Sequence, residues 1–301
     1  MAGAALAACG APLAAPRAAV PGTDPVSGEL TSVEVDLPGA DLAAVRGPAG
    51  AIVVGAVLQS GRVLGGAAPE CSVRRLPSGA AAAVSARCQA YLGAYAGLER
   101  ARSFLLSAGA EALPAAPVLA DPSGDQPGAG LRYLPDPDAF TLLPGPAGAR
   151  VPAALNAGAA ARESARRHLR GIAASHPEEA AGAAHFLGAA AAGDPGYLAS
   201  SEPDGDPTGE TDLSRPLPSG AAASAQLAGA LWAWAEQTGD LVGAARAVLA
   251  AARALGSPDG GSGPAALLSL VAGQLDGAER DQACAVFRAR LGAAQGLSAC
   301  P

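Results

Sequence analysis

The residues best able to do chemistry lie in one stretch that carries a carboxylate, several guanidinium groups and every imidazole of the chain. Glu163 follows Arg162 directly, and Arg166 comes three residues later. All three histidines follow in the same stretch: His168, His176 and His185. A carboxylate among imidazoles can ligate a metal ion, whereas a carboxylate among guanidinium groups forms ion pairs. The spacing of these residues decides between the two arrangements.

Glu163 and its arginines have the spacing of neighbours on a helix, since Arg166 and Arg167 lie three and four residues after it. One interpretation is a solvated helix face whose ion pairs contribute roughly a few tenths of a kcal/mol each. The other is a cleft in which Arg162 and Arg166 hold an acidic peptide or ligand, because guanidinium groups bind carboxylates well. The spacing modestly favours the first interpretation.

The histidines could form a metal site completed by a glutamate of the same stretch: Glu163 or Glu179. Their steps of eight and nine residues do not place them on one helix face, as a step of four would. We therefore expect His168 and His176 to be surface residues near helix ends. We expect His185 to pack against the helical turn that begins at Arg162.

The spacing of Arg162, Glu163 and Arg166 is that of the zinc-peptidase motif His-Glu-x-x-His. In that motif two histidines one helical turn apart ligate zinc, and the glutamate activates the bound water. Only the glutamate is present here. Arginine stays protonated, offers no lone pair and repels a dication, so it cannot replace the histidines. The segment predicts a zinc-site helix that lacks its ligands.

Four further segments match the same type of protein. Residues 90–104 are an aromatic-rich run that leads into an amphipathic helix, and residues 138–140 read Asp-Ala-Phe. Residues 180–195 contain Phe186 and end in a Gly-Asp-Pro turn, and residues 227–236 contain an Ala-Leu-Trp core. From residue 89 to about residue 255 the chain resembles the gluzincin peptidases, the thermolysin-like and fungalysin-like group. In that group residues 138–140 would match the Asn-Ala-Phe/Tyr edge strand beside the active cleft.

The resemblance implies where the zinc site would lie. The third zinc ligand of the family, a glutamate, falls on Ala181, and the aspartate that orients a ligand histidine falls on His185. Arg162 and Arg166 occupy the other two ligand positions, so no zinc ligand remains and we expect no bound zinc. Glu163 is then vestigial, no catalytic residue is expected, and we expect the remaining cleft to be lined by His185 and Trp234.

The apolar pattern changes once along the chain, near residue 150. Before that point, short runs predict strands at 30–37, 51–58, 116–120, 131–134 and 140–143. One helix is expected among them, from about Ser85 to Ser107. After that point, longer runs predict helices, and strands followed by helices predict an α+β protein. We expect a mixed sheet with a helix over 29–150, a mainly helical half over 151–301 and a cleft between them, which is also the gluzincin order.

The N-terminus carries a possible lipid-attachment signal. Residues 6–10, Leu-Ala-Ala-Cys-Gly, fit a bacterial lipobox in which Cys9 takes the lipid. Only eight residues precede Cys9, so we expect the true start to lie upstream. The alternative is an alanine-rich N-terminus that contains a cysteine by chance. The lipoprotein interpretation predicts a signal over 1–9, a flexible tether over 10–28 and attachment to the membrane of the cell envelope.

The remaining four cysteines are local in sequence: Cys71, Cys88, Cys284 and Cys300. An even number in an exported chain indicates two disulfides, for which three pairings exist. We expect the local pairing, of the first two cysteines and of the last two. The alternatives are a metal cluster, although no Cys-x-x-Cys spacing occurs, or buried free thiols in a cytoplasmic protein.

Composition argues against several partners. The net charge is −7 and the pI is about 5.0, so the chain has no basic footprint for nucleic acid. No phosphate loop, dinucleotide fingerprint or serine-nucleophile motif occurs. The acidic loop 202–212 begins like a calcium loop, but the final glutamate would fall on Arg215, so a solvated loop is favoured over structural calcium. Trp232 and Trp234 cannot share a helix face, so we expect one to be partly exposed.

The sequence as a whole predicts a lipid-anchored envelope protein with a gluzincin-like α+β fold and no zinc. Its expected role is to bind a peptide or protein ligand or to serve a structural purpose. One alternative is an active zinc metallopeptidase with unorthodox ligands. Another is an unrelated helical envelope lipoprotein whose likeness to peptidases is compositional.

Overall fold

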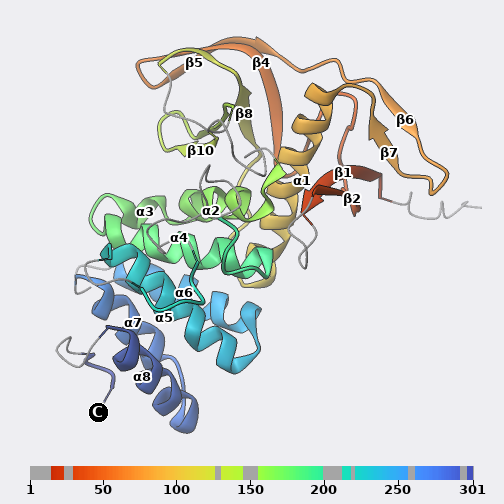
Figure 1. Cartoon of the computed structure of the whole chain (residues 1–301). Coiled ribbons are helices and arrows are strands. Elements are labelled where there is room, and N and C mark those ends of the chain that lie inside the picture. The colour runs from red at the N-terminus through yellow and green to blue at the C-terminus, as the bar shows by residue number, and fades with distance from the viewer. Residues whose placement is uncertain are drawn as a thin grey trace, which may run out of the picture.

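The computed structural model describes residues 15–23, 30–125, 130–144, 155–198, 212–217, 221–256, 262–291 and 297–300. Cys9 and most of the calcium-like loop lie outside these ranges, so the lipid attachment and the solvated loop remain predictions. The protein is α+β, as the sequence predicts. Strands and one long helix come first, and a mainly helical half follows (Figure 1).

The N-terminal half contains two mixed sheets. The smaller sheet has the strand order β2 (Leu30–Asp36), β1 (Arg17–Thr23), β7 (Ala81–Ala83) and β6 (Val73–Arg75). The larger sheet has the order β10 (Leu131–Leu134), β11 (Ala139–Leu142), β8 (Ala116–Ala120), β4 (Gly50–Gln59) and β3 (Arg46–Gly47). Two more strands pair with β4: β5 (Arg62–Ala67) and β9 (Ser123–Gly124). Parallel and antiparallel pairs occur in both sheets.

Strand β1 corrects the predicted tether of residues 10–28. Arg17–Thr23 pairs with β2 along its whole length and with β7 on its other side. Ala18 and Val20 are buried in the core of the N-terminal half. A short run of alanine and valine is therefore enough to form a strand where a sheet edge and a helix are available to cover it.

Strand β11 corrects the predicted edge strand. It pairs with β10 on one side and with β8 on the other, so residues 138–140 lead into an interior strand. The antiparallel partner β10 occupies the described end of the sheet instead, with Leu131 opposite Leu142. All four residues of β11 are buried, as an interior strand requires.

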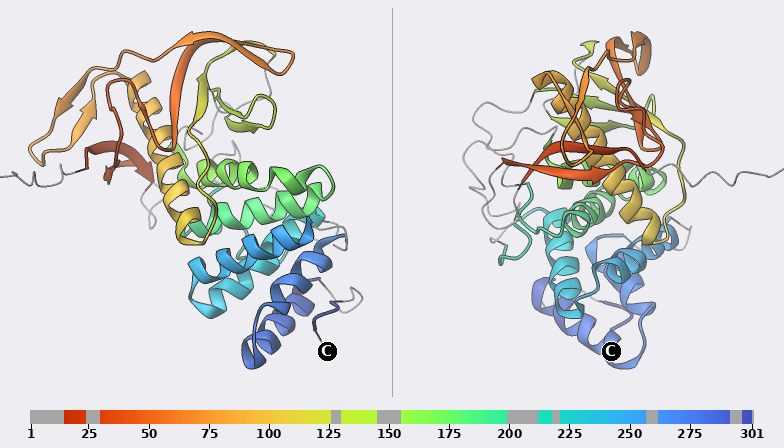
Figure 2. Two further views of the ribbon diagram at one scale, coloured as in Figure 1. Left: turned by 180° about the vertical axis from the view of Figure 1, so that it is seen from behind. Right: turned by 90° about the vertical axis from the view of Figure 1, so that its right-hand side faces the viewer.

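The long helix α1 (Ala86–Ser107) joins the sheets to the helical half. Ser85 caps it by accepting a hydrogen bond from the backbone N–H of Cys88, which explains why the predicted start is correct. The helix packs on strands of both sheets and on α2 (Ala157–His168), and it runs obliquely between the two sheets (Figures 1 and 2). Gly97 allows the close approach to α2, because a Cβ there would lie 2.9 Å from Cβ of Ala160.

The helical half stacks away from the sheets (Figure 2). Its helices after α2 are α3 (Arg170–Ala173), α4 (Pro177–Ala192), α5 (Ala223–Thr238), α6 (Leu241–Leu255), α7 (Pro264–Gly273) and α8 (Gly277–Leu291). α4 packs between α2 and α5, and α5 also contacts the three helices that follow it. The two halves are coupled through α1, because Leu98 belongs to the N-terminal core and Leu105 to the helical core.

Two disulfides form, between Cys71 and Cys88 and between Cys284 and Cys300. The predicted local pairing is confirmed. Each bond closes a loop of sequence separation 17 or 16, for which chain-entropy estimates give about 3 kcal/mol of stabilisation. In the described residues, no helix has both the length and the apolar character needed to cross a membrane.

Candidate functional site

Helix α2 is fixed at its first turn by Asn156. The side-chain oxygen of Asn156 accepts a hydrogen bond from the backbone N–H of Ala159 at 2.9 Å, which caps the helix. Its amide nitrogen donates to the carbonyl oxygen of Tyr197 at 2.7 Å. Asn156 is buried, so one side chain ties the start of α2 to the turn that follows α4.

The carboxylate of Glu163 is fully buried, with 0% exposure. Its Oε1 accepts hydrogen bonds from Nε of Arg162 at 3.1 Å and lies 3.3 Å from Nη1 of Arg166. Its Oε2 accepts the backbone N–H of Tyr133 in β10 at 2.9 Å. We call Glu163, the two arginines and the Tyr133 backbone the Glu163 cluster. Burying a charge of this kind is tolerated because each oxygen has a partner.

The helix of the second predicted motif packs beside α2. A Cβ at Gly188 would lie 3.0 Å from Cβ of Arg162, so the first turns of α2 lie beside the last turns of α4. Arg162 and Arg166 are one turn apart on α2, and Ala181 and His185 are one turn apart on α4. All four residues are partly exposed. The four positions named by the resemblance therefore occur on two adjacent helices.

Tyr197 fills the space between these helices. A Cβ at Gly158 would lie 2.4 Å from its ring, and one at Gly188 would lie 2.7 Å from its hydroxyl oxygen. The ring meets His185 edge-on with the centroids 5.6 Å apart, and the hydroxyl donates to the carbonyl oxygen of His185 at 3.4 Å. Burial raises the pKa of Tyr197. The positive charges of Arg162 and Arg166 oppose this rise, and the negative charge of Glu163 adds to it. A buried tyrosine thus packs near Arg162 and against His185, two of the positions that the resemblance names.

The donor set does not fit zinc. Zinc takes imidazole nitrogen, thiolate or carboxylate ligands. The three positions implied by the resemblance carry two guanidinium groups, which remain protonated, and the methyl group of Ala181. The one carboxylate nearby, Glu163, is held by Arg162, Arg166 and a peptide N–H.

A second acidic group, Asp138, reaches α2 from the turn of the β10–β11 hairpin. Asp138 accepts two hydrogen bonds from Arg167, from Nε and Nη2 at 2.8 Å each, and one from the Tyr133 hydroxyl at 2.9 Å. Nη1 of Arg170 lies 3.1 Å from Oδ1 of Asp138. Arg167 also donates a hydrogen bond to the carbonyl oxygen of Pro114 at 2.8 Å. Hydrogen bonding from Arg167 lowers the pKa of Asp138 to about 2. We call these side chains the Asp138 cluster.

The Asp138 cluster was missed in the sequence. Helical spacing paired Arg167 with Glu163, whereas its side chain turns to Asp138, which is 29 residues earlier. The spacing of residues along one helix cannot reveal an ion-pair partner that lies in a different element, here the β10–β11 hairpin. The only available signal was an excess of arginine: four arginines between residues 162 and 170 accompany a single glutamate, so other acceptors must serve some of them.

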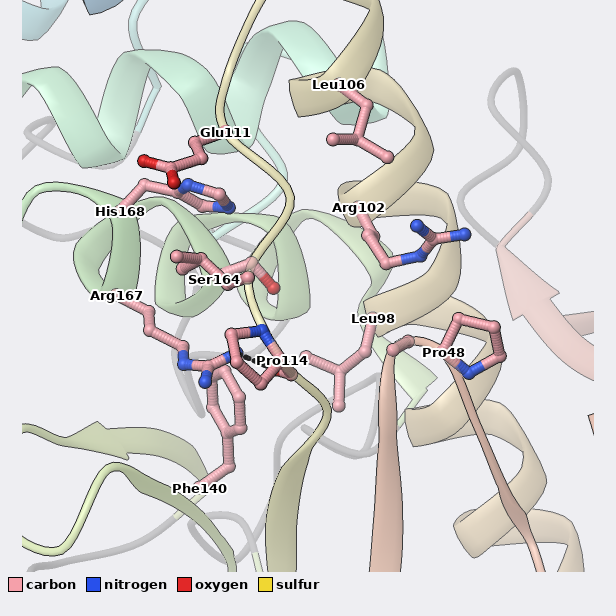
Figure 3. Close-up of a pocket in the computed structure, with 12 residues that line it drawn as sticks. Pro48, Leu98, Arg102, Leu106, Glu111, Pro114, Phe140, Ser164, Arg167 and His168 are labelled. Carbon is pink, nitrogen blue, oxygen red and sulfur yellow. Dashed lines mark hydrogen bonds between the residues drawn. The ribbon is translucent and has the colours of Figure 1, made fainter.

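A pocket opens where α2 meets α1 and the segment that joins α1 to β8 (Figure 3). Ser164, Arg167 and His168 line it from α2, on a face turned away from Arg162 and Arg166. His168 is the last residue of α2, so it lies at a helix end as predicted, and its ring is only partly exposed between these elements. Burial, followed by the charges of Arg167 and Arg253, lowers the pKa of His168 to about 4.

His176 lies at a helix end, as predicted, but it is not a surface residue. It is the N-terminal cap residue of α4, and its side chain is only 12% exposed. Its Nδ1 lies 3.8 Å from Oε1 of Glu179. Glu179 is buried and accepts a hydrogen bond from the backbone N–H of Gly263, so it joins α4 to the start of α7.

Trp234 packs in the helical core, and the expectation that it lines a cleft is wrong. Its ring meets Phe287 of α8 edge-on, with the centroids 6.0 Å apart. Trp232 is buried as well, so neither tryptophan is the partly exposed one that the sequence led us to expect. The reason is that α5 is surrounded, with contacts to α4, α6, α7 and α8.

Within the described ranges, no group of three or more His, Cys, Asp or Glu side chains could hold a metal ion. At the described end of the calcium-like loop, Nε of Arg215 lies 2.8 Å from Oδ2 of Asp212. Comparison of the sequence with protein-family models and with curated proteins finds no match.

Proposed function

We propose that this protein is a non-catalytic, gluzincin-like protein of the bacterial cell envelope, which binds a peptide or protein ligand or serves as a structural component. Its ancestor would have carried zinc ligands at Arg162, Arg166 and Ala181. The proposal is supported by helices α2 and α4, which carry the two motifs and pack against each other, and by the buried, ion-paired position of Glu163.

The environment of Glu163 is the observation that carries the proposal. In a zinc peptidase this glutamate takes a proton from metal-bound water, so it needs an accessible oxygen next to the metal. Glu163 is fully buried, and its oxygens contact Arg162, Arg166 and the Tyr133 N–H instead. Such a carboxylate links α2 to β10 and does not face a substrate.

The envelope location is supported by the cysteines. Two disulfides are typical of proteins that fold in an oxidising compartment. Cys9, in its lipobox context, would provide the lipid anchor that holds such a protein at a membrane surface. The predicted partners are accordingly a membrane, reached through that lipid, and a peptide or protein ligand.

Restoring the ligands tests the proposed ancestry. The variant Arg162→His, Arg166→His, Ala181→Glu places two imidazoles and a carboxylate on α2 and α4. We expect it to bind one zinc ion, measured by isothermal titration and by metal content after dialysis. A matched control is Arg162→His, Arg170→His, Ala181→Glu, which has the same new ligands with two of them eight residues apart, and it should not retain zinc.

Two outcomes would count against the proposal. If the restored variant is folded and oxidised but binds zinc no better than the control, α2 and α4 lack zinc-peptidase geometry and an unrelated helical envelope protein is favoured. If the unaltered protein retains stoichiometric zinc, it is a metallopeptidase-like protein with unorthodox ligands, and the histidines are the first candidates for those ligands. Folding is checked by circular dichroism and by a thiol assay that finds no free cysteine besides Cys9.

A further inference from the structure

A second cavity lies next to the pocket of Figure 3, with a volume of about 250 Å³. It is bounded by the segment after α1, by the α2–α3 corner and by α6. Glu111, Leu113 and His168 line both spaces, so they adjoin. For comparison, an apolar cavity of about 150 Å³ is known to bind benzene.

Apolar atoms form just over half of the walls of this cavity. The apolar part is formed by six aliphatic side chains: Ala110, Leu113, Leu169, Ile172, Leu249 and Ala252. Gly171, which is exposed, completes one side, and a Cβ built there would have nothing within 4 Å, so a larger side chain at this position would meet no clash at its Cβ. An apolar ligand would gain about 25 cal/mol for each Å² of surface that it removes from water here.

His168 supplies the polar group of the cavity. Its imidazole is half-buried and makes no hydrogen bond with any residue that the structure describes. With a pKa of about 4 it is neutral near pH 7, so it presents one N–H donor and one acceptor nitrogen. Half-buried polar groups usually find a partner, and a ligand that carries a hydroxyl could provide one.

The charges at the rim favour a neutral ligand. Glu111 and Arg253 are exposed and of opposite sign. Arg253 is held by a hydrogen bond to the carbonyl oxygen of Gly109 at 2.6 Å, and Arg167 by its bonds to Asp138. An anion would therefore meet Glu111, and a cation would meet the arginines, at the entrance to an apolar space.

We propose that this cavity binds a small, uncharged and largely apolar molecule that carries one hydroxyl group, with the hydroxyl hydrogen-bonded to His168. The site is separate from the Glu163 cluster and does not depend on the gluzincin resemblance. Its occupant would be of the size of a substituted phenol.

The test uses p-cresol as the hydroxyl-bearing probe and toluene as its apolar match. The chain has three histidines, so the imidazole signals of His168 in a ¹H–¹³C NMR spectrum can be assigned with His168→Leu. We expect p-cresol to shift these signals saturably and to bind about five-fold more tightly than toluene, which is the effect of one net hydrogen bond. In His168→Leu, followed by the methyl signals of Ile172, the two probes should bind alike.

Gly171 provides matched variants for the same test. Gly171→Phe should fill the cavity and abolish binding of both probes, while Gly171→Ala should retain it. The proposal is overturned if p-cresol leaves the His168 signals of the folded protein unchanged, or if Gly171→Phe is folded and still binds. It is also overturned if His168→Leu keeps the preference for p-cresol. This second test does not require Gly171→Phe to fold.

Discussion

Two acid–arginine clusters fasten the β10–β11 hairpin to helix α2, and they differ mainly in burial. Glu163 is completely buried and accepts the backbone N–H of Tyr133, whereas the side chain of Asp138 is 34% exposed and accepts the hydroxyl of the same tyrosine. Both acids are paired with two arginines. The comparison shows that one pair of elements can be joined by a closed charge cluster and by an open one that responds to solvent.

The largest effect is expected when Glu163 loses its cations. Arg162→Met with Arg166→Met leaves a buried carboxylate with the Tyr133 N–H as its remaining described partner. We expect a loss of about 3–5 kcal/mol in the free energy of unfolding, measured in urea. Adding Glu163→Leu to the double variant should recover most of that loss. A double variant as stable as the unaltered protein would show that water reaches Glu163.

A smaller effect is expected at the open cluster. Asp138→Ala removes the acceptor of Arg167, whose side chain is only 8% exposed, although Pro114 still accepts one hydrogen bond. We expect a loss of about 2 kcal/mol in the same urea assay. Arg170→Ala is the matched control, since that arginine is half-exposed, and it should cost about 0.5 kcal/mol. Equal losses in the two variants would contradict the assignment of Arg167 as the main partner.

The pH dependence of stability tests the contribution of the more exposed cluster, through Asp138. Asp138 has a folded pKa of about 2 against an ordinary value of 3.8, so its stabilisation is present above pH 4 and is lost as the pH falls toward 2. Solvent screening at this exposure reduces the contribution to about 1 kcal/mol. We expect the stability difference between the unaltered protein and Asp138→Asn to shrink by this amount between pH 5 and pH 2. A constant difference would contradict the expectation.

The smallest effect is expected at Tyr197. Tyr197→Phe keeps the ring that packs between Gly158 and Gly188 and removes only a long hydrogen bond of 3.4 Å. We expect a change of about 0.5 kcal/mol or less in the thermal unfolding free energy. Tyr197→Ala, which removes the ring, should cost about 3–5 kcal/mol. If the two variants lose similar stability, the hydroxyl and not the ring holds α2 against α4.

Local patterns predicted much of the fold. The expected strands 116–120 and 131–134 match β8 and β10, and the expected helix over 85–107 matches α1. Their signals lie within the segments, as apolar runs bounded by turns and as a serine cap. Strands β1, β5 and β7 were not predicted, because they are rich in alanine and glycine, which carry little strand preference, and β6 has only three residues.

At the site, contacts along one helix were predicted, whereas contacts between different elements were not. Helical spacing brought Arg162 and Arg166 to Glu163 correctly, because that contact is local. The partners from elsewhere in the chain could not be foreseen: the Tyr133 N–H, the Tyr197 ring and the Asp138 carboxylate all come from segments that only folding brings to α2. The partial burial of His168 could not be foreseen for the same reason, since Glu111 and Leu113 of the segment after α1 line the same pocket.

We propose that the positions of a peptidase zinc site persist in this protein without zinc chemistry. The most direct test is the metal content of the protein, measured by mass spectrometry after oxidative folding, exposure to zinc and extensive dialysis. We expect folded protein with both disulfides and less than about one zinc per ten molecules. One zinc per molecule would contradict the claim and would direct the search for ligands to His168, His176, His185 and Glu163.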